Sequence, residues 1–329
     1  MSFTRCSTRA FASARPLRRI DSVRIATDIP PAETSAPPVE SPWRRFVGEF
    51  AESRMALAGL ATLVVIVMTA ITAPIISPQN PYDLAQLDVL DSKLPPGERS
   101  SSTDTTYWLG TDDQGRDMLS GIFYGLRISL AVGASSTVIA LAIGLAMGLA
   151  AAYFGGWVDA LIMRIADIQL SFPAILIALI LLALLGQGID KIIAALVTVQ
   201  WAYYARTVRA SALVERQKEY IEAAHVLGLS RARIVFRHLL PNCLPPLIVV
   251  ATVQVAHAIL LESTLSFLGL GLPITEPSLG LLIANGFQYL LSGKYWISFY
   301  PGLALLLSIM AINLVADQLR DVLNPRLSR

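Results

Sequence analysis

Long runs of apolar residues, separated by shorter polar segments, fill the chain from residue 55 to its C-terminal region. Six of these runs are long enough to cross the hydrocarbon core of a bilayer, which is about 30 Å thick. Backbone N–H and C=O groups in lipid must pair within a helix or a closed barrel, and these Leu-, Ile- and Ala-rich runs lack the alternation of a barrel. The pattern therefore predicts six transmembrane helices, at about residues 55–76, 128–154, 161–185, 192–209, 244–270 and 296–315.

The composition supports an all-α integral membrane protein and excludes several other classes. Hydrophobic residues make up 54% and charged residues 15% of the 329 residues, and the mean hydropathy is +0.57. Soluble domains carry about 25% charged residues. The net charge of +2 is too small to indicate nucleic-acid binding. Two cysteines and three histidines without metal-ligand spacing predict no disulfide framework, no metal site and no cofactor.

Positive charge gathers before the first predicted span, between the fourth and fifth spans, and after the last span. Cytoplasmic segments of membrane proteins carry such an excess of Lys and Arg. With six spans these three segments fall on one side, so both termini and a loop at residues 206–241 are predicted to be cytoplasmic. The acidic segment at 77–127 then faces outward. The basic residues concerned are Arg44, Arg45, Arg54, Arg206, Arg209, Arg216, Lys218, Arg231, Arg233, Arg237, Arg320, Arg326 and Arg329.

Residues 1–50 are predicted to be a disordered cytoplasmic tail. The first 42 residues are rich in Arg, Ser, Ala and Pro and lack the apolar periodicity of a core. The basic, Ser-rich composition leaves a transit peptide as the alternative interpretation.

The loop at 206–241 contains the pattern of two short helices joined at a glycine. The first helix is expected from Glu219 to Leu227, where Gly228 suits the left-handed conformation that ends a helix. Ser230 is a suitable N-cap for a second helix over residues 231–239, and Pro241 is expected to end that helix.

Tyr220, Ala224 and Leu227 are spaced to share one face of the first of these helices. That face is suited to docking in an apolar cleft of a partner protein, with Glu222 and the arginines as a charged rim. The alternative is a solvated loop that merely satisfies the positive-inside rule, and composition by itself favours this alternative.

The spacing of Glu222-Ala223-Ala224, Gly228 and Leu240-Pro241 resembles the cytoplasmic loop of bacterial ABC-importer permeases. His238 stands where that family often has Ile, and a histidine there is common in its peptide-importing branch. Other segments are similar to dipeptide, oligopeptide and nickel permeases of the same family: GTDDQGRD at 110–117, YFGGWVD at 153–159, SFP at 171–173, LSFLGLG at 265–271 and PSLG at 277–280. The resemblance covers most of residues 105–325.

The resemblance implies a six-helix bundle of the type I importer-permease kind in the bacterial cytoplasmic (inner) membrane. It implies three kinds of partner besides lipid: a second, related permease subunit, separate ATP-binding-cassette ATPase subunits, and a periplasmic or extracellular solute-binding protein. The expected substrates are dipeptides or oligopeptides, with nickel as the alternative. The residues that this resemblance assigns to ATPase coupling are Glu222, Ala223, Ala224, Gly228, Leu240 and Pro241.

Two other classes of function compete with an ABC permease. The chain has no G-x-x-x-x-G-K-[ST] phosphate-binding loop, so energy from ATP has to come from another polypeptide. An ion-coupled secondary transporter is the first alternative. Such transporters often have internal repeats and charged residues within the membrane, but the sequence shows no clear repeat and the spans contain few charges. An intramembrane enzyme is disfavoured because His257 and Ser263 are six positions apart and lie on different faces of a helix.

Polar residues on the fifth span form a second candidate site. Gln254, His257, Glu262 and Ser266 fall within one broad half of the helix surface. Because buried charge is costly in lipid, this half is expected to face protein or water. Two interpretations remain equally open: a pore-lining face, and a buried hydrogen-bonded group that holds helices together.

Small residues repeat every four positions on the second span, at Ala140, Gly144, Gly148 and Ala152. Such a stripe permits close helix packing. Packing within the subunit is favoured over a role at a subunit interface.

Overall fold

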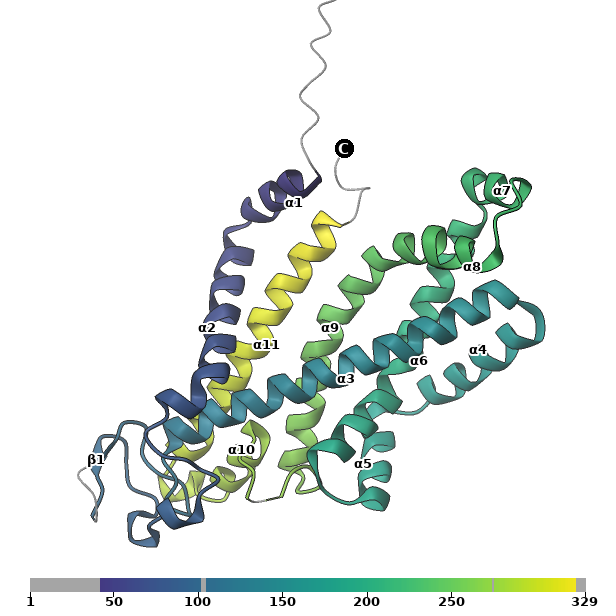
Figure 1. Ribbon diagram of the computed structural model, residues 1–329. Helices are drawn as coiled ribbons and strands as arrows, with labels where there is room; N and C mark the ends of the chain where they lie inside the picture. Colours follow the sequence, from purple (N-terminus) through teal and green to yellow (C-terminus); the bar gives the residue numbers. More distant parts are fainter. Residues whose placement is uncertain (1–41, 102–104, 274, 324–329) are drawn as a thin grey trace, which may run out of the picture. The chain divides into compact units, whose positions relative to one another are not determined.

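The computed structural model describes residues 42–101, 105–273 and 275–323, and the predicted tail at residues 1–41 lies outside these ranges. The described chain is mainly helical (Figure 1). Its helices are α1 (Pro42–Ala51), α2 (Arg54–Ile76), α3 (Met118–Phe154), α4 (Gly156–Leu170), α5 (Ala174–Leu185), α6 (Ile189–Arg216), α7 (Glu219–Val226), α8 (Arg231–Arg233), α9 (Leu240–Phe267), α10 (Leu279–Phe287) and α11 (Trp296–Val322). The shorter elements are the 3-10 helices η1 (Leu84–Gln86), η2 (Val89–Asp91) and η4 (Leu290–Ser292), the π-helix η3 (Ile234–Leu239), and the strands β1 (Glu98–Arg99) and β2 (Thr106–Tyr107).

Residues 42–50, predicted as part of the disordered tail, form most of helix α1. The rings of Phe46 and Phe50 stack one turn apart, with centroids separated by 6.5 Å. The Gln318 side chain of α11 donates a hydrogen bond of 3.0 Å to the Glu49 carbonyl. These contacts order a segment whose composition alone predicts disorder.

Four continuous helical stretches are long and apolar enough to cross a membrane: α2, α3, the run from Arg231 to Phe267, and α11. They correspond to the first, second, fifth and sixth predicted spans. The fourth predicted span forms α6, which is 28 residues long but is not among these four, since its polar Gln200 and its charged residues lower its apolar character.

The third predicted span, at 161–185, is wrong as a continuous helix. It is divided between α4 and α5, which meet at an angle of 91°. The break falls at residues 171–173, where Pro173 cannot donate a backbone hydrogen bond and disfavours a helical conformation at Phe172. Counted as one bent span, the pair brings the number of apolar spans in the described chain to five.

Helix α3 begins ten residues before the predicted span, because Asp117 caps it. The Asp117 carboxylate accepts hydrogen bonds from the Ser120 backbone N–H at 2.9 Å and from the Ser120 hydroxyl at 2.6 Å. A capping carboxylate satisfies backbone N–H groups that have no partner in the first turn of a helix.

Between α2 and α3, residues 77–101 and 105–117 form a cap at one end of the bundle, where β1 and β2 pair antiparallel. Asp91 is fully buried there. Its carboxylate accepts hydrogen bonds from the Ser100 hydroxyl at 2.5 Å, the Ser101 backbone N–H at 2.8 Å and the Tyr107 hydroxyl at 3.0 Å. Burial would raise the pKa of Asp91, but the hydrogen bonds from Ser100, Ser101 and Tyr107 outweigh burial and lower that pKa.

The small-residue stripe of α3 packs against α6, which confirms the predicted packing within the subunit. A Cβ atom added at Gly144 would lie 2.4 Å from the Tyr204 Cβ, and one added at Gly148 would lie 2.5 Å from the Ala205 carbonyl oxygen. Ala140 and Ala152 are buried in the same cluster as Tyr204. The α3 and α6 backbones therefore approach each other at two points that exclude any side chain.

This packing predicts that Gly148→Ala destabilises the protein by about 1–3 kcal/mol, because the added methyl group would overlap backbone and the Val208 side chain. The matched control is Gly302→Ala in α11, where an added Cβ meets no atom within 4 Å. Thermal unfolding of the two purified variants in detergent measures the difference. Equal unfolding temperatures for both variants and the unaltered protein would contradict the close packing of α3 and α6.

Candidate functional site

The link between α6 and α9 forms an elbow of two short helical arms, defined here as residues 219–239. The first arm, α7, ends in a glycine-based C-cap: the Leu229 N–H donates to the Ala224 carbonyl at 3.1 Å, and the Gly228 N–H donates to the His225 carbonyl at 3.0 Å. Gly228 has φ +69°, as predicted, and its surroundings are open, so the backbone angle and not crowding calls for glycine.

The second arm begins at Ser230, whose side chain accepts a hydrogen bond of 3.4 Å from the Arg233 N–H, as the predicted N-cap does. The predicted end of this arm at Pro241 is wrong. The helix continues through the π-helix η3 directly into α9, and Pro241, Pro245 and Pro246 all lie inside α9. Pro241 is tolerated because it falls in the first turn of α9, where the hydrogen-bonding register changes from π to α.

A small apolar cluster holds the two arms together. Its buried members are Ile221, Ala224, Ile234 and Leu239, and Leu229 packs against them. Ala224 therefore faces the interior of the elbow, and the expectation that it shares a docking face with Tyr220 and Leu227 is wrong. The reason is that the second arm folds back over this side of α7, which helical spacing within α7 cannot reveal.

The outer surface of α7 is exposed and partly apolar. Val226 is 88% exposed and Leu227 is 78% exposed, and the side chains of Glu222, Ala223 and His225 are exposed beside them. Two large apolar side chains at the exposed tip of this elbow form a surface suited to a protein partner. The six coupling residues predicted from sequence differ in exposure. Ala224 is buried and Leu240 is half-buried, and the exposed ones are Glu222, Ala223, Gly228 and Pro241.

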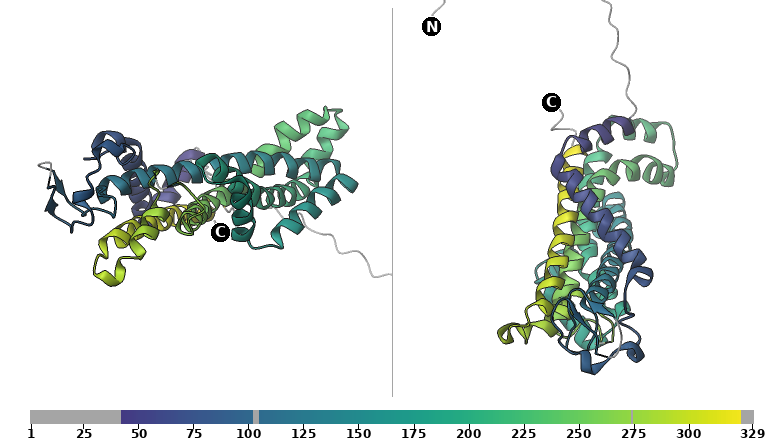
Figure 2. Two further views of the ribbon diagram at one scale, coloured as in Figure 1. Left: turned by 90° about the horizontal axis from the view of Figure 1, so that it is seen from below. Right: turned by 90° about the vertical axis from the view of Figure 1, so that its left-hand side faces the viewer.

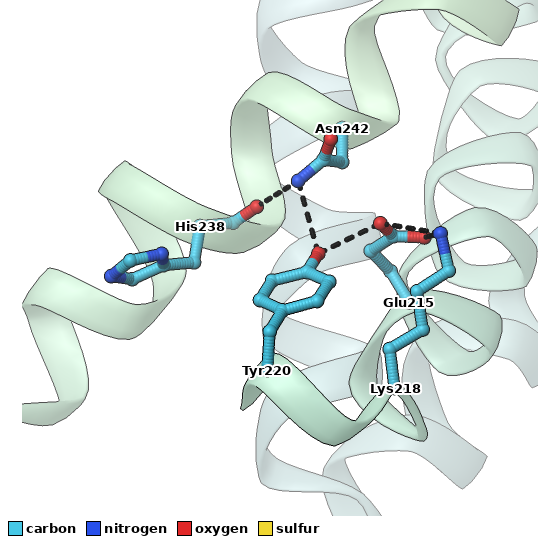
Figure 3. Close-up of polar contacts among 5 residues, drawn as sticks. All are labelled: Glu215, Lys218, Tyr220, His238 and Asn242. Carbon is cyan, nitrogen blue, oxygen red and sulfur yellow. Dashed lines mark hydrogen bonds and ion pairs between the residues drawn. The ribbon is translucent and has the colours of Figure 1, made fainter. Parts of the chain in front are cut away.

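A polar cluster connects the elbow to the two flanking helices (Figure 3). The Tyr220 hydroxyl donates to the Glu215 carboxylate at 2.7 Å, and the Asn242 amide donates to the Tyr220 oxygen at 3.0 Å. Lys218 lies 2.7 Å from the same carboxylate. The sequence shows Glu215 and Lys218 three residues apart, but the contacts of Tyr220 with Glu215 and Asn242 depend on the fold.

The electrostatics of this cluster follow from its hydrogen bonds. Burial would raise the pKa of Glu215, but the hydrogen bonds from Lys218 and Tyr220 outweigh it and lower that pKa below its ordinary value. Burial together with the adjacent Glu215 carboxylate raises the pKa of Tyr220 to about 12. At neutral pH the carboxyl group is therefore charged and accepts hydrogen bonds, and the phenol keeps its proton.

A cavity of about 990 Å³ lies between α6, α9 and the end of α11. Its walls are mainly apolar and include Pro245, Pro246 and several valines of α9. Glu215 and Asn242 of the polar cluster line it, and so does Gln254 of the second candidate site. The elbow is thus attached to the helices that form this cavity.

The four polar residues predicted on the fifth span do not meet at one site. Glu262 is fully buried and accepts hydrogen bonds from Ser129 of α3 at 3.0 Å and from Ser266 at 2.8 Å. The Gln254 carbonyl accepts a hydrogen bond of 3.2 Å from the Gln200 side chain of α6. The His257 side chain is exposed. Glu262 and Ser266 therefore form a buried polar link between α3 and α9, separate from the cavity that Gln254 lines.

Within the described ranges, no group of three or more His, Cys, Asp or Glu side chains is arranged to hold a metal ion.

Comparisons with known proteins match these features to one family. Residues 140–329 match the family model described as "binding-protein-dependent transport system inner membrane component", and residues 41–96 match the N-terminal TM domain of oligopeptide transport permease C. The inward-facing MetNI methionine ABC transporter aligns with a TM-score of 0.51 at 23% identity, over 63% of this chain and 98% of that chain, which shows a shared fold.

Curated relatives extend the match over nearly the whole chain. The dipeptide transport system permease protein DppC of Alkalihalophilus pseudofirmus is 36% identical over 90% of this chain and 95% of its own length. A putative peptide transport system permease protein of Brucella suis is 42% identical, over 82% of this chain and 87% of its own length. The di/tripeptide permease DppC of Pseudomonas aeruginosa is 38% identical, over 87% and 93% respectively. The chain therefore belongs to the family of binding-protein-dependent transport system inner membrane components, the membrane permeases of ABC importers.

Proposed function

We propose that this chain is the permease subunit through which an ABC importer moves dipeptides or oligopeptides across a bacterial cytoplasmic membrane. The observation that carries the proposal is the near full-length similarity to permeases named for dipeptide, di/tripeptide and peptide transport. The cavity beside the elbow, with mainly apolar walls and a few polar groups, supports it. Such a surface suits peptides, whose side chains vary while their backbone stays polar.

Energy for transport comes from separate ATPase subunits in this proposal, because the sequence lacks a phosphate-binding loop of the G-x-x-x-x-G-K-[ST] type. The exposed surface of α7 is the contact for these subunits. Its apolar tip at Val226 and Leu227 supplies buried area, and Glu222 supplies a charged rim. Closure of the ATPase dimer then moves the elbow as a unit, since its own apolar cluster holds the two arms together.

The elbow's attachment to α6 and α9 gives this movement a route to the cavity. Two residues separate the end of α6 from the start of α7, and η3 continues into α9 without a break. A displacement of the elbow therefore shifts the cytoplasmic ends of two cavity-lining helices together. This is a rigid-body form of switching between two arrangements of packed helices.

The cytoplasmic side is the end that holds the elbow. Figures 1 and 2 place the elbow at the end of the bundle where α1 begins and α11 finishes, opposite the β1–β2 hairpin. The excess of Lys and Arg in these segments supports a cytoplasmic location for them and for both termini. The β1–β2 end then faces a solute-binding protein outside the membrane.

A second, related permease subunit completes the pathway in this proposal. Only 22–39% of the most apolar stretch of each spanning helix is buried within this chain. The remaining apolar surface is available to lipid and to a partner subunit.

Uptake assays in a strain that lacks this permease test the function directly. We expect uptake of a labelled dipeptide to disappear, to return with the unaltered gene, and to stay absent when the partner ATPase carries an inactive phosphate-binding loop. Labelled nickel, taken up in parallel, is expected to be unaffected. If only nickel uptake is lost, the substrate is nickel and not a peptide. If uptake persists without ATP but needs an ion gradient, the protein is a secondary transporter and not an ABC permease.

The two alanines of the coupling motif are expected to respond differently to a charged side chain. Ala223→Glu adds a carboxylate to the exposed contact surface, so co-purification of the ATPase should fall about tenfold while the elbow stays folded. Ala224→Glu buries a charge in the apolar cluster and should unfold the elbow itself. Limited proteolysis of the isolated permease at residues 219–239 separates the two effects.

Ala85→Glu, at an exposed position in the segment between α2 and α3, is the matched control and should leave both readouts unchanged. If Ala223→Glu leaves ATPase co-purification intact, α7 is not the contact surface.

A further inference from the structure

We propose that Tyr220 is a positioning residue that makes α6 and α9 move together with the elbow, and that transport is coupled to ATP hydrolysis through its hydroxyl group. The inference rests on the proposed function and assigns a role in it to the cluster of Tyr220, Glu215 and Asn242, named here the clasp. The clasp brings together three helices: Glu215 is in the last turn of α6, Tyr220 in the first turn of α7, and Asn242 in the first turn of α9.

The Tyr220 hydroxyl acts as donor and acceptor at once. It donates to Glu215 at 2.7 Å and accepts from Asn242 at 3.0 Å, so the same oxygen atom touches both neighbouring helices (Figure 3). A hydrogen bond to an ionised carboxylate is about twice as strong as one between neutral groups. A phenylalanine at this position would keep the ring and lose both connections.

The two partners of Tyr220 are themselves held in place. Lys218 approaches both oxygens of the Glu215 carboxylate, at 2.7 and 2.9 Å. The Asn242 amide nitrogen, besides bonding Tyr220, donates to the His238 carbonyl one turn earlier at 2.7 Å. Because Glu215 and Asn242 are fixed, a displacement of Tyr220 is transmitted to the helices and not absorbed by rotation of their side chains.

The clasp differs from the elbow's apolar cluster in what it connects. The apolar cluster joins α7 to the second arm and keeps the elbow compact. The clasp joins α7 to α6 and α9, and it does so at the wall of the 990 Å³ cavity, which both Glu215 and Asn242 line. Force applied at the exposed surface of α7 therefore reaches two helices of the cavity wall, α6 and α9, through one side chain.

Loss of the clasp has a different consequence from loss of the elbow. The ATPase contact surface, Ala223 and Leu227 included, does not involve the Tyr220 hydroxyl, so ATPase subunits should still bind and hydrolyse ATP. The ends of α6 and α9 would keep their apolar contacts but lose the hydrogen-bonded connection to α7, and ATP hydrolysis would be converted less efficiently into opening and closing of the cavity. A purely structural role would instead lower the amount of assembled complex and leave the work done per ATP unchanged.

The first test uses the complete complex, with its ATPases and solute-binding protein, reconstituted in liposomes. For Tyr220→Phe we expect ATPase co-purification and hydrolysis close to those of the unaltered complex, and a fall of roughly fivefold or more in labelled dipeptide transported per ATP. Tyr295→Phe is the control, because Tyr295 is an exposed tyrosine directly before α11, outside the elbow and the clasp. An unchanged transport-to-hydrolysis ratio in Tyr220→Phe overturns the proposal, whatever the yield of the complex.

Conservative replacements of the partners sharpen this test. Glu215→Gln keeps an acceptor for the Tyr220 hydroxyl, whereas Glu215→Leu removes it, so the first should retain more transport per ATP than the second. Asn242→Ala combined with Tyr220→Phe should be no worse than Tyr220→Phe alone, because both remove the same connection. Independent, additive losses would show that the three residues do not act as one unit.

The second test follows the helices themselves and does not depend on the identity of the substrate. Spin labels are attached at Ser211→Cys in α6 and Val249→Cys in α9, both at the cavity wall, with Cys6 and Cys243 replaced by alanine. We expect a nucleotide-dependent change in the distance between the labels in the otherwise unaltered complex, and its loss in Tyr220→Phe. A full distance change in Tyr220→Phe overturns the proposal.

The distance measurement also separates failure of the clasp from failure of the peptide assignment. A complex that shows the nucleotide-dependent distance change, its loss in Tyr220→Phe, and no dipeptide transport would contradict the substrate and support the clasp. A complex with no nucleotide-dependent change in the unaltered chain would contradict the clasp and leave the peptide assignment to the uptake assay.

Discussion

Direct contact between the backbones of α3 and α6 is the interaction on which the rest of this structure depends. At Gly144 and Gly148 the two helices are too close for any side chain, and Ala140 and Ala152 continue the same stripe. Lipid tails are as apolar as the helix side chains, so burying apolar surface between helices gains little free energy in a bilayer. Helices there associate through close packing and through polar links. The α3–α6 contact provides the packing, and it positions α6, which carries part of the cavity wall.

Polar links reinforce this contact toward the end that holds the elbow. The Arg216 guanidinium donates to the Ala152 carbonyl at the end of α3, at 3.0 Å. Asp159 of α4 binds Arg209 of α6 with both carboxylate oxygens. Helix α6 therefore reaches the elbow already fixed on two sides, so that movement of the elbow acts on a stiff element.

Local signals in the sequence predict the parts of the site that depend on local structure. The apolar runs predict the spanning segments, and Gly228 and Ser230 predict the turn and cap of the elbow, because backbone angles and caps are determined by neighbouring residues. The continuation of the helix past Pro241 could not be predicted in this way, since it depends on the π-helix that precedes it. The inward direction of Ala224 and the contacts of Tyr220 could not be predicted either, because both depend on how the second arm and α9 fold back on α7.

The right-angled junction of α4 and α5 has a consequence for the surrounding bilayer. Helix α5 has 12 residues and a length of about 18 Å, well short of the hydrocarbon thickness of about 30 Å. Near the end of α4, Asp167 forms an exposed ion pair with Arg206. Charges favour water or lipid head groups over hydrocarbon, so the bilayer or a neighbouring protein surface has to accommodate, at this place, a segment shorter than the hydrocarbon core.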